Sequence, residues 1–99
     1  MSGKQRRVWW GDFRAPEFEG IDPEAVIAVV PVAAIEQHGP HLPVSTDTTI
    51  MEGMLAETIA LLPADLDIRI LPVQAVGKSN EHTFEPGTLT LSPTVLIEA

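Results

Sequence analysis

Residues 25–35, AVIAVVPVAAI, form an apolar run that is rich in valine and contains no charged side chain. A continuous apolar run of this length is typical of a β-strand that is covered on both faces, as strands in parallel sheets are. Pro31 interrupts the run and has no amide hydrogen to donate, so we expect the strand pairing to break or to lie at an edge there. The run therefore favours a buried strand in an α/β protein.

Residues 46–63 predict a helix, because apolar side chains recur there at steps of three and four and form one stripe. Thr46 or Asp47 stands where the N-cap of this helix is expected, and Pro63 is expected to end it. The segment therefore predicts one full amphipathic helix that follows the first strand.

Residues 66–76, LDIRILPVQAV, predict a second strand, and the loop 77–87 follows it. A short extended piece then leads to a new helix at Ser92-Pro93, where a serine cap precedes a proline in the first helical position. The resulting order, β–loop–α–β–loop–(β)–α, predicts an α/β sheet with helical crossovers.

The length of the chain allows one small domain at most. A chain of 99 residues buries only somewhat more than about 60% of its unfolded surface, so its own core is marginal. The basic residues 1–7 are interpreted as a flexible leader, and residues 8–99 as part of a single domain. The last helix is only beginning at Ala99, and one full helix cannot cover both faces of a parallel sheet. We therefore expect the N-terminal part of a larger domain.

Composition excludes several classes of partner. Fourteen acidic against six basic residues give a formal charge of −8, whereas nucleic-acid affinity depends on Lys and Arg at phosphates, so nucleic acid and anionic membranes are poor partners. No apolar run approaches the ~20 residues that span a bilayer. The N-terminus lacks the apolar core of a secretory signal, which leaves the cytoplasm as the expected location. Without cysteine, disulfides and thiolate metal sites are excluded.

The segment 35–47, IEQHGPHLPVSTD, concentrates metal-ligating residue types just after the first predicted strand. Glu36 and His38 are two residues apart, so in extended backbone their side chains point the same way. Asp47 arrives at a helix N-terminus and can fold back over the same point, beyond the carboxyl end of a strand, where ligands bind in open α/β sheets. A Glu, His and Asp set suits Zn²⁺, Mn²⁺ or Fe²⁺ rather than Ca²⁺. An N-cap role for Asp47 and a turn role for His38 remain open.

A second acid–imidazole pair, Glu81 and His82, follows the second predicted strand. Both pairs then fall at the same rim of the sheet, which indicates a shared pocket, although a solvated loop is an equal alternative. We expect His41, three residues after His38, to hydrogen-bond a carboxylate ligand or the backbone of the turn rather than to bind metal.

Two blocks of the sequence resemble one protein family. PVAAIEQHGPHLPVSTDT is similar to the signature of the creatininase (creatinine amidohydrolase) family, and GKSNEHTFEPGTLTLS to its Gly-x-Ser-x-Glu-His-x-x-x-Pro-Gly-Thr stretch. The blocks occur in the family's order and together span roughly residues 25–92. Ala33, Ser45 and Glu85 depart from the family pattern, and the last of these could alter the rim of the substrate site.

The resemblance implies a three-layer α/β/α fold and a pair of divalent metal ions, Zn, Mn or Fe, that activate water against an amide carbonyl. It implies that Glu36 binds one ion, His38 the other, and Asp47 both. The remaining ligands and the general acid or base are expected in a later part of a longer protein, so this chain alone is expected to be inactive. Four residues would support the ligands or line the substrate rim: His41, Ser79, Glu81 and His82.

The leading hypothesis is therefore a metal-dependent hydrolase that acts on a non-peptide C–N bond of a small cyclic or linear amide. In such proteins, deformylation of an opened purine and trimming of a modified peptide are related chemistries that stay open. The full-length form is expected to be a homo-oligomer. Two alternatives belong to other classes: a truncated or split-subunit fragment that needs a partner, and an acidic binding module without metal. The last predicts unchanged metal content when Glu36 or His38 is replaced.

Overall fold

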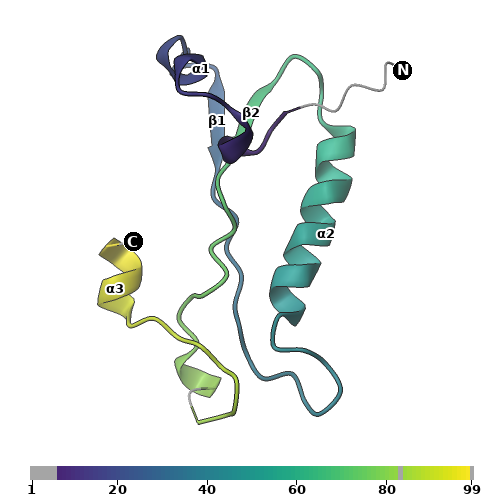
Figure 1. The fold of residues 1–99 in the computed structure, drawn as a ribbon, viewed down its shortest axis with the longest axis vertical. Coiled ribbons are helices and arrows are strands. Elements are labelled where there is room, and N and C mark those ends of the chain that lie inside the picture. The colour runs from purple at the N-terminus through teal and green to yellow at the C-terminus, as the bar shows by residue number, and fades with distance from the viewer. Residues whose placement is uncertain (1–6, 83, 99) are drawn as a thin grey trace.

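Two parallel strands and the helix between them organise the structure, which is a computed structural model that describes residues 7–82 and 84–98 (Figure 1). Trp10–Asp12 and Asn80–His82 form short 3-10 helices. The strands and α-helices of the described part are, in chain order, α1 (Pro16–Glu19), β1 (Val26–Val29), α2 (Thr46–Leu61), β2 (Asp67–Ile70) and α3 (Pro93–Glu98). This order confirms the predicted α/β class.

The strands β1 and β2 pair in parallel, in a register that runs from Val26 opposite Asp67 to Val29 opposite Ile70. Parallel strands require a crossover connection, and α2 lies within it. Figure 1 shows that the chain beyond both strands continues to a set of loops at the carboxyl ends of the strands, while α1 lies at the opposite end. The sheet therefore presents its carboxyl ends to the loops that contain the predicted site.

Both predicted strands are shorter than their apolar runs. After Val29, the pairing of the two segments is reduced to an isolated bridge between Val32 and Gln74. Around it, the Gln74 amide donates to the Pro31 carbonyl, and the Ala33 amide donates to the Gln74 carbonyl, both at 2.9 Å. Because proline offers only its carbonyl, a regular ladder cannot pass through it. The predicted break at Pro31 is confirmed.

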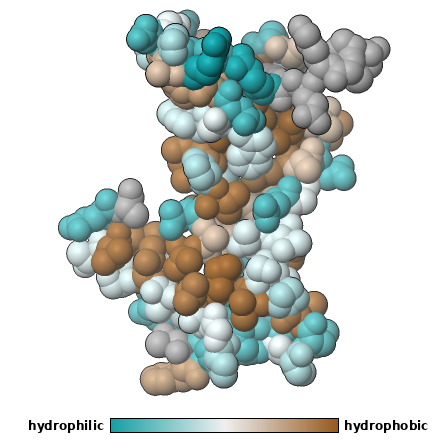
Figure 2. Space-filling view, in the orientation of Figure 1, coloured by the Kyte–Doolittle hydropathy of each residue, from teal (hydrophilic) through white to brown (hydrophobic). Residues whose placement is uncertain are grey.

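The prediction that the first strand is covered on both faces is wrong for the described structure. Ile27 is 44% exposed, and Val30 and Val32 are each 60% exposed. Figure 2 shows that hydrophobic side chains occupy much of the visible surface. The run has the apolar composition of a strand that is covered on both faces. The described residues, however, pack against only part of its surface.

The buried core is small and centres on β2. Its buried hydrophobic members are Val8, Ile68 and Ile70. Three residues of the predicted helical stripe pack against them together with Trp9 and Val29: Leu55, Ile59 and Leu62. The same stripe leaves Ile50 and Met54 more than half exposed. The helical periodicity therefore predicted the helix correctly, while only the C-terminal half of its stripe reaches the core.

The ends of the helices agree with the sequence except at the start of α2. Its N-cap is Ser45, without a side-chain cap, so the prediction of Thr46 or Asp47 in that position is wrong. The Thr46 hydroxyl instead donates to the Pro43 carbonyl at 2.6 Å, and Asp47 faces an imidazole. The helix ends at Leu61, before Pro63, as predicted.

The helix α3 begins at Pro93, as the sequence predicted. The Ser92 hydroxyl accepts a hydrogen bond from the Val95 amide at 3.2 Å, which confirms the serine cap. Within the described ranges, no helix combines the length and apolar character needed to span a bilayer.

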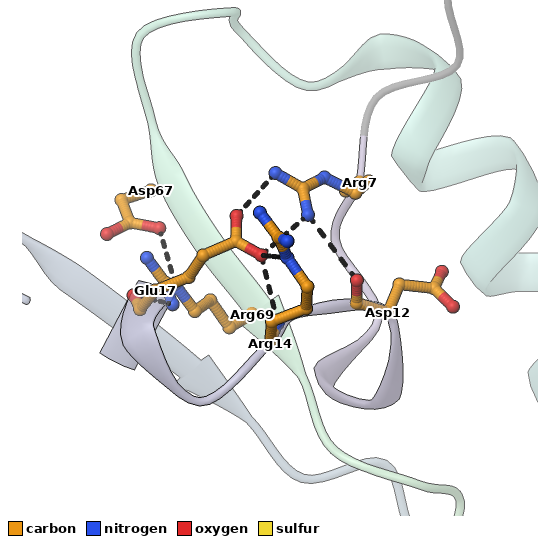
Figure 3. A network of polar contacts seen from close by, with 6 residues as sticks. All are labelled: Arg7, Asp12, Arg14, Glu17, Asp67 and Arg69. Carbon is orange, nitrogen blue, oxygen red and sulfur yellow. Dashed lines mark hydrogen bonds and ion pairs between the residues drawn. The ribbon is translucent and has the colours of Figure 1, made fainter. Parts of the chain in front are cut away.

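A cluster of charged residues fastens the N-terminal segment to β2 (Figure 3). Arg7 donates two hydrogen bonds to the carboxylate of Glu17, at 2.8 and 2.5 Å, and the Arg14 amide donates to the same carboxylate at 2.9 Å. The buried Arg69 donates to the Glu17 carbonyl at 2.9 Å and to the Asp67 carboxylate at 3.0 Å. Residues 1–6 of the predicted flexible leader lie outside the described residues, whereas Arg7 is held by this cluster.

The Glu17 carboxylate is expected to make the protein sensitive to acid. Its hydrogen bonds, first from Arg7 and then from the Arg14 amide, lower its pKa from 4.5 to about 2. A carboxyl group with a lowered pKa stabilises the fold fully above its ordinary value and loses that contribution as the pH falls through its folded-state value. Thermal unfolding followed by circular dichroism should therefore show wild type losing more stability than Glu17→Gln between about pH 4.5 and pH 2. Glu57→Gln, on the exposed face of α2, is the matched control, and parallel curves for wild type and Glu17→Gln would contradict the expectation.

Candidate metal centre

A tight bend between β1 and α2 positions the first predicted ligands. The Glu36 amide donates to the Val44 carbonyl at 3.2 Å, and His38 and Leu42 form an antiparallel bridge. Gly39 has a φ of +81°, a conformation that glycine adopts without steric cost. The Gly39-Pro40 step therefore turns the chain as predicted and returns it to the start of α2.

Within this bend, the imidazole of His38 is oriented by a hydrogen bond to the backbone carbonyl of Glu36. Its Nδ1 lies 2.8 Å from the Glu36 carbonyl oxygen, and its Nε2 lies 3.3 Å from Oδ1 of Asp47. A carbonyl oxygen only accepts, so the proton on Nδ1 is donated to it, and in the neutral ring Nε2 carries a lone pair. That lone pair faces a carboxylate oxygen. Two such acceptors at this distance require a proton or a cation between them.

The pKa of His38 is raised from its ordinary value. The largest cause is the hydrogen bond to the Glu36 carbonyl, and the negative charge of Asp47 adds to it, while burial acts in the opposite direction. The hydrogen bond at Nδ1 and the nearby carboxylate of Asp47 therefore both favour the protonated ring.

The His38–Asp47 pair fits part of a metal coordination shell. Bonds of about 2.0–2.2 Å to a tetrahedral cation place two ligand atoms about 3.3 Å apart, which agrees with the separation between Nε2 and Oδ1. An imidazole nitrogen and a carboxylate oxygen are donors that suit Zn²⁺, Mn²⁺ or Fe²⁺. The sequence predicted that Asp47 would fold back toward His38, and the structure confirms this contact.

Glu36 does not complete a triad. Its amide and carbonyl are both engaged in the bend, and its side chain is partly buried. Among the described residues there is no cluster of three or more His, Asp or Glu side chains arranged to hold an ion. The structure therefore brings together two of the three predicted ligands, and a ligand role for Glu36 stays a prediction.

His41 is exposed, and its ring lies beside Gly39. The predicted hydrogen bond from His41 to a carboxylate ligand or to the turn is absent among the described residues. The bend is held instead by Gln37, whose side-chain oxygen accepts a hydrogen bond from the Gly39 amide. A place for His41 at the substrate rim stays a prediction.

The second loop buries two polar atoms that find no hydrogen-bond partner in the described part of the chain: Ser79 Oγ and His82 Nδ1. The Ser79 side chain is fully buried, and its amide donates to the Thr90 hydroxyl at 2.8 Å. The side chain of Glu81 lies outside the described residues. Buried hydroxyl and imidazole groups normally have partners, so these two atoms are suited to a polar ligand or water.

The two loops lie against each other through hydrogen bonds, while the pocket shared by their two acid–imidazole pairs stays a prediction. The Gln37 amide donates to the Thr88 hydroxyl at 3.0 Å, and the Leu89 amide donates to the Ile35 carbonyl at 2.9 Å. The Gln37 side chain also donates to the Glu85 carboxylate. Sequence reasoning missed Gln37 and Thr88, although both stand within the quoted blocks, and noted Glu85 only as a departure.

Comparison with known proteins gives one consistent relationship. The family model described as creatininase, creatinine amidohydrolase, matches residues 11–99. A mycofactocin precursor peptide peptidase from Mycolicibacterium smegmatis is 40% identical over 72 residues, which are 71% of this chain and 29% of that protein. Its counterpart from Mycobacterium tuberculosis is 39% identical over 74 residues, covering 69% of this chain and 30% of that protein.

No solved structure matches the chain significantly. The chain spans less than a third of the length of the curated relatives it matches. The family match, by contrast, covers nearly the whole chain and includes both loops described above. The chain therefore belongs to the creatininase family.

Proposed function

We propose that the full-length protein is a metal-dependent hydrolase that cleaves an amide C–N bond. The observation that carries the proposal is the 3.3 Å contact between His38 Nε2 and Asp47 Oδ1, in a bend whose backbone orients the imidazole. It is supported by membership in a family described as creatinine amidohydrolase and by relatives described as peptidases.

The relatives alter the substrate class expected from the sequence. The sequence predicts hydrolysis of a non-peptide bond in a cyclic or linear amide, whereas the matched relatives are described as precursor peptide peptidases. Both substrates present an amide carbonyl to water, so the same site chemistry serves either. We therefore place a peptide C–N bond first and a small cyclic amide second.

In the proposed mechanism, Glu36, His38 and Asp47 would hold divalent cations. The cations would supply a Lewis acid and lower the pKa of water toward neutrality. His38 keeps its proton on Nδ1, because the Glu36 carbonyl accepts it, and so presents Nε2 as the ligand atom. Asp47 arrives on the first turn of α2 and offers its carboxylate to the same point. The bend thus orients its donor atoms before any cation binds.

Finer features implied by the family belong to the same proposal. They are a three-layer α/β/α fold, two Zn, Mn or Fe ions for each complete site, a homo-oligomeric full-length protein, and a cytoplasmic location. The two parallel strands with one crossover helix are consistent with such a fold. Ser79 and His82 would face the substrate, since each carries a buried polar atom without a hydrogen-bond partner among the described residues.

One observation favours a second candidate function. The described residues bring only two metal-ligating side chains into contact. A chain that contributes a partial site to a partner would show the same pair. Such a protein would bind a metal ion tightly only after it associates with that partner.

Chelation tests the proposed function. The purified full-length protein, treated with chelator and then supplied with Zn²⁺, Mn²⁺ or Fe²⁺, should lose and regain hydrolysis of short peptides or of creatinine-like cyclic amides. Cleavage is read by mass spectrometry. Hydrolysis that persists after complete metal removal would contradict the proposal, whereas metal binding and activity that appear only with an added partner protein would favour the second candidate.

A further inference from the structure

We propose that Glu85 is a positioning residue that acts through Gln37 to fix the bend that carries His38. This inference rests on the proposed function, because it assigns to Glu85 a role in metal binding at that site. Gln37 stands between two predicted ligands, Glu36 and His38, and it contacts the second loop from its own position in the bend.

The carboxamide of Gln37 is held at both ends. Its Nε2 donates to Oε2 of Glu85, and its Oε1 accepts from the amide of Gly39. A side-chain amide has one donor end and one acceptor end, so only one orientation satisfies both partners. The bond to the carboxylate is charge-assisted and therefore stronger than a bond between neutral groups. Glu85 thus dictates which way the amide points, and the amide holds Gly39.

Gly39, whose amide donates to Gln37, is the residue on which the turn depends. Gly39 has a φ of +81°, and it follows His38 directly. The amide of Gly39 belongs to the same peptide unit as the carbonyl of His38. A hydrogen bond to that amide therefore restrains the backbone torsion of His38, and with it the direction of the imidazole toward Asp47.

Glu85 contacts the bend at Gln37 and its own loop at His82. The side chain of Gln37 contacts Glu85 and Gly39, whereas the imidazole of the next residue, His38, contacts Asp47. Oε2 of Glu85 also lies 3.9 Å from Nδ1 of His82, and the Glu85 amide donates to the His82 carbonyl at 3.0 Å. Glu85 is therefore anchored in the second loop, and among the described residues its contact with the bend is made through Gln37.

The exposure of Glu85 allows a positioning role to be distinguished from a purely structural role. Its side chain is 42% exposed, so its truncation leaves no buried cavity. A second contact, from the Gln37 amide to the Thr88 hydroxyl, keeps the two loops together when the Glu85 contact is lost. Replacement of Glu85 should therefore loosen the orientation of the bend without separating the loops.

Cobalt binding by the full-length protein tests the inference. Residues that orient metal ligands typically contribute about 10–100-fold to metal affinity. We expect Glu85→Ala and Gln37→Ala each to weaken Co²⁺ binding by about 10–100-fold and to alter the visible absorption of bound Co²⁺. The double variant should be no weaker than either single variant, because both remove one linkage.

Two further variants make this result specific. Glu85→Gln keeps an oxygen that can accept from Gln37 and should retain affinity within about threefold of wild type. Glu52→Ala, which removes an exposed acid on α2, is the control for charge and should have no effect on affinity or absorption. Should Glu85→Ala fail to fold, Gln37→Ala removes the same contact from its other end and provides the comparison with wild type.

Hydrogen exchange of the metal-free protein separates failure of this inference from failure of the proposed function. Glu85→Ala should accelerate exchange in the peptide covering residues 36–44 by at least about tenfold, because the Gly39 amide loses its fixed acceptor. Unchanged exchange, or additive losses of affinity in the double variant, would overturn the inference while leaving the metal site intact. A wild-type protein that binds no Co²⁺ through His38 would instead overturn the proposed function.

Discussion

Replacing Asp47 by alanine should abolish stoichiometric metal binding and lower kcat/KM for amide hydrolysis by about 10³-fold or more in the full-length protein. The reason is its contact with His38, in which Oδ1 lies 3.3 Å from Nε2. Without this carboxylate, the imidazole keeps its orientation but loses the neighbouring negative charge that favours a cation. Without a bound cation, water would not be activated at neutral pH. The fall in kcat/KM is therefore expected to come from a slower chemical step rather than from weaker substrate binding.

Two comparisons make the Asp47 result interpretable. Asp47→Asn keeps the size of the side chain and one oxygen but removes its charge, and it should lose most of the same activity. Asp65→Ala removes an exposed acid after α2 and should leave activity and metal content unchanged. Steady-state kinetics with metal analysis of each variant gives the answer. Full activity in Asp47→Ala, with one or two bound ions, would show that Asp47 is not a ligand.

Replacing Ile70 by alanine should lower the free energy of unfolding by about 2–5 kcal/mol, the usual cost of such a truncation in a core. Ile70 is 3% exposed, and its amide donates to the Val8 carbonyl at 2.6 Å. The described core contains only two other buried hydrophobic residues, Val8 and Ile68, so the loss falls on a large part of it. The truncation of Ile70 should also weaken the packing of the N-terminal segment on β2.

Chemical denaturation followed by tryptophan fluorescence measures this effect, because Trp9 packs against the core. Leu61→Ala is the matched control: Leu61 is 83% exposed at the end of α2, and its truncation should change stability by less than about 0.5 kcal/mol. Equal effects of the two truncations would mean that the buried cluster around β2 does not stabilise the protein.

The elements that the sequence predicted well depend on local signals. Pro63 and the Ser92-Pro93 step mark helix ends directly, since proline cannot continue a helix and serine can cap one. The crossover order of strand, helix and strand predicted the parallel pairing. Strand length and coverage could not be predicted, because they depend on which other residues pack on the apolar run, as the exposure of Val30 and Val32 shows.

The site shows the same division between local and distant signals. The approach of Asp47 to His38 follows from a turn at Gly39 and a helix start soon after it, and both are readable in the sequence. The contact between Gln37 and Glu85 joins residues 48 positions apart. A single sequence carries no signal for such a pairing. For this reason the role of Gln37 could not be predicted from the sequence, although Gln37 lies between Glu36 and His38.

The contact between His38 and Asp47 also explains why an expected helix cap was wrong. An acid at a helix start is often a cap, because its carboxylate can accept from the first free amides. Here the carboxylate of Asp47 faces the imidazole, and Ser45 takes the cap position without a side-chain bond. A helix start that gives up its side-chain cap to orient an acid toward a histidine is consistent with a functional role for that acid.

Anomalous diffraction from crystals of the full-length protein, recorded at the absorption edge of the bound metal, tests the central claim most directly. We expect a peak within about 2.2 Å of both His38 Nε2 and the Asp47 carboxylate, a distance typical of imidazole and carboxylate ligands. A stoichiometric metal bound elsewhere, with these two side chains turned apart, would contradict it.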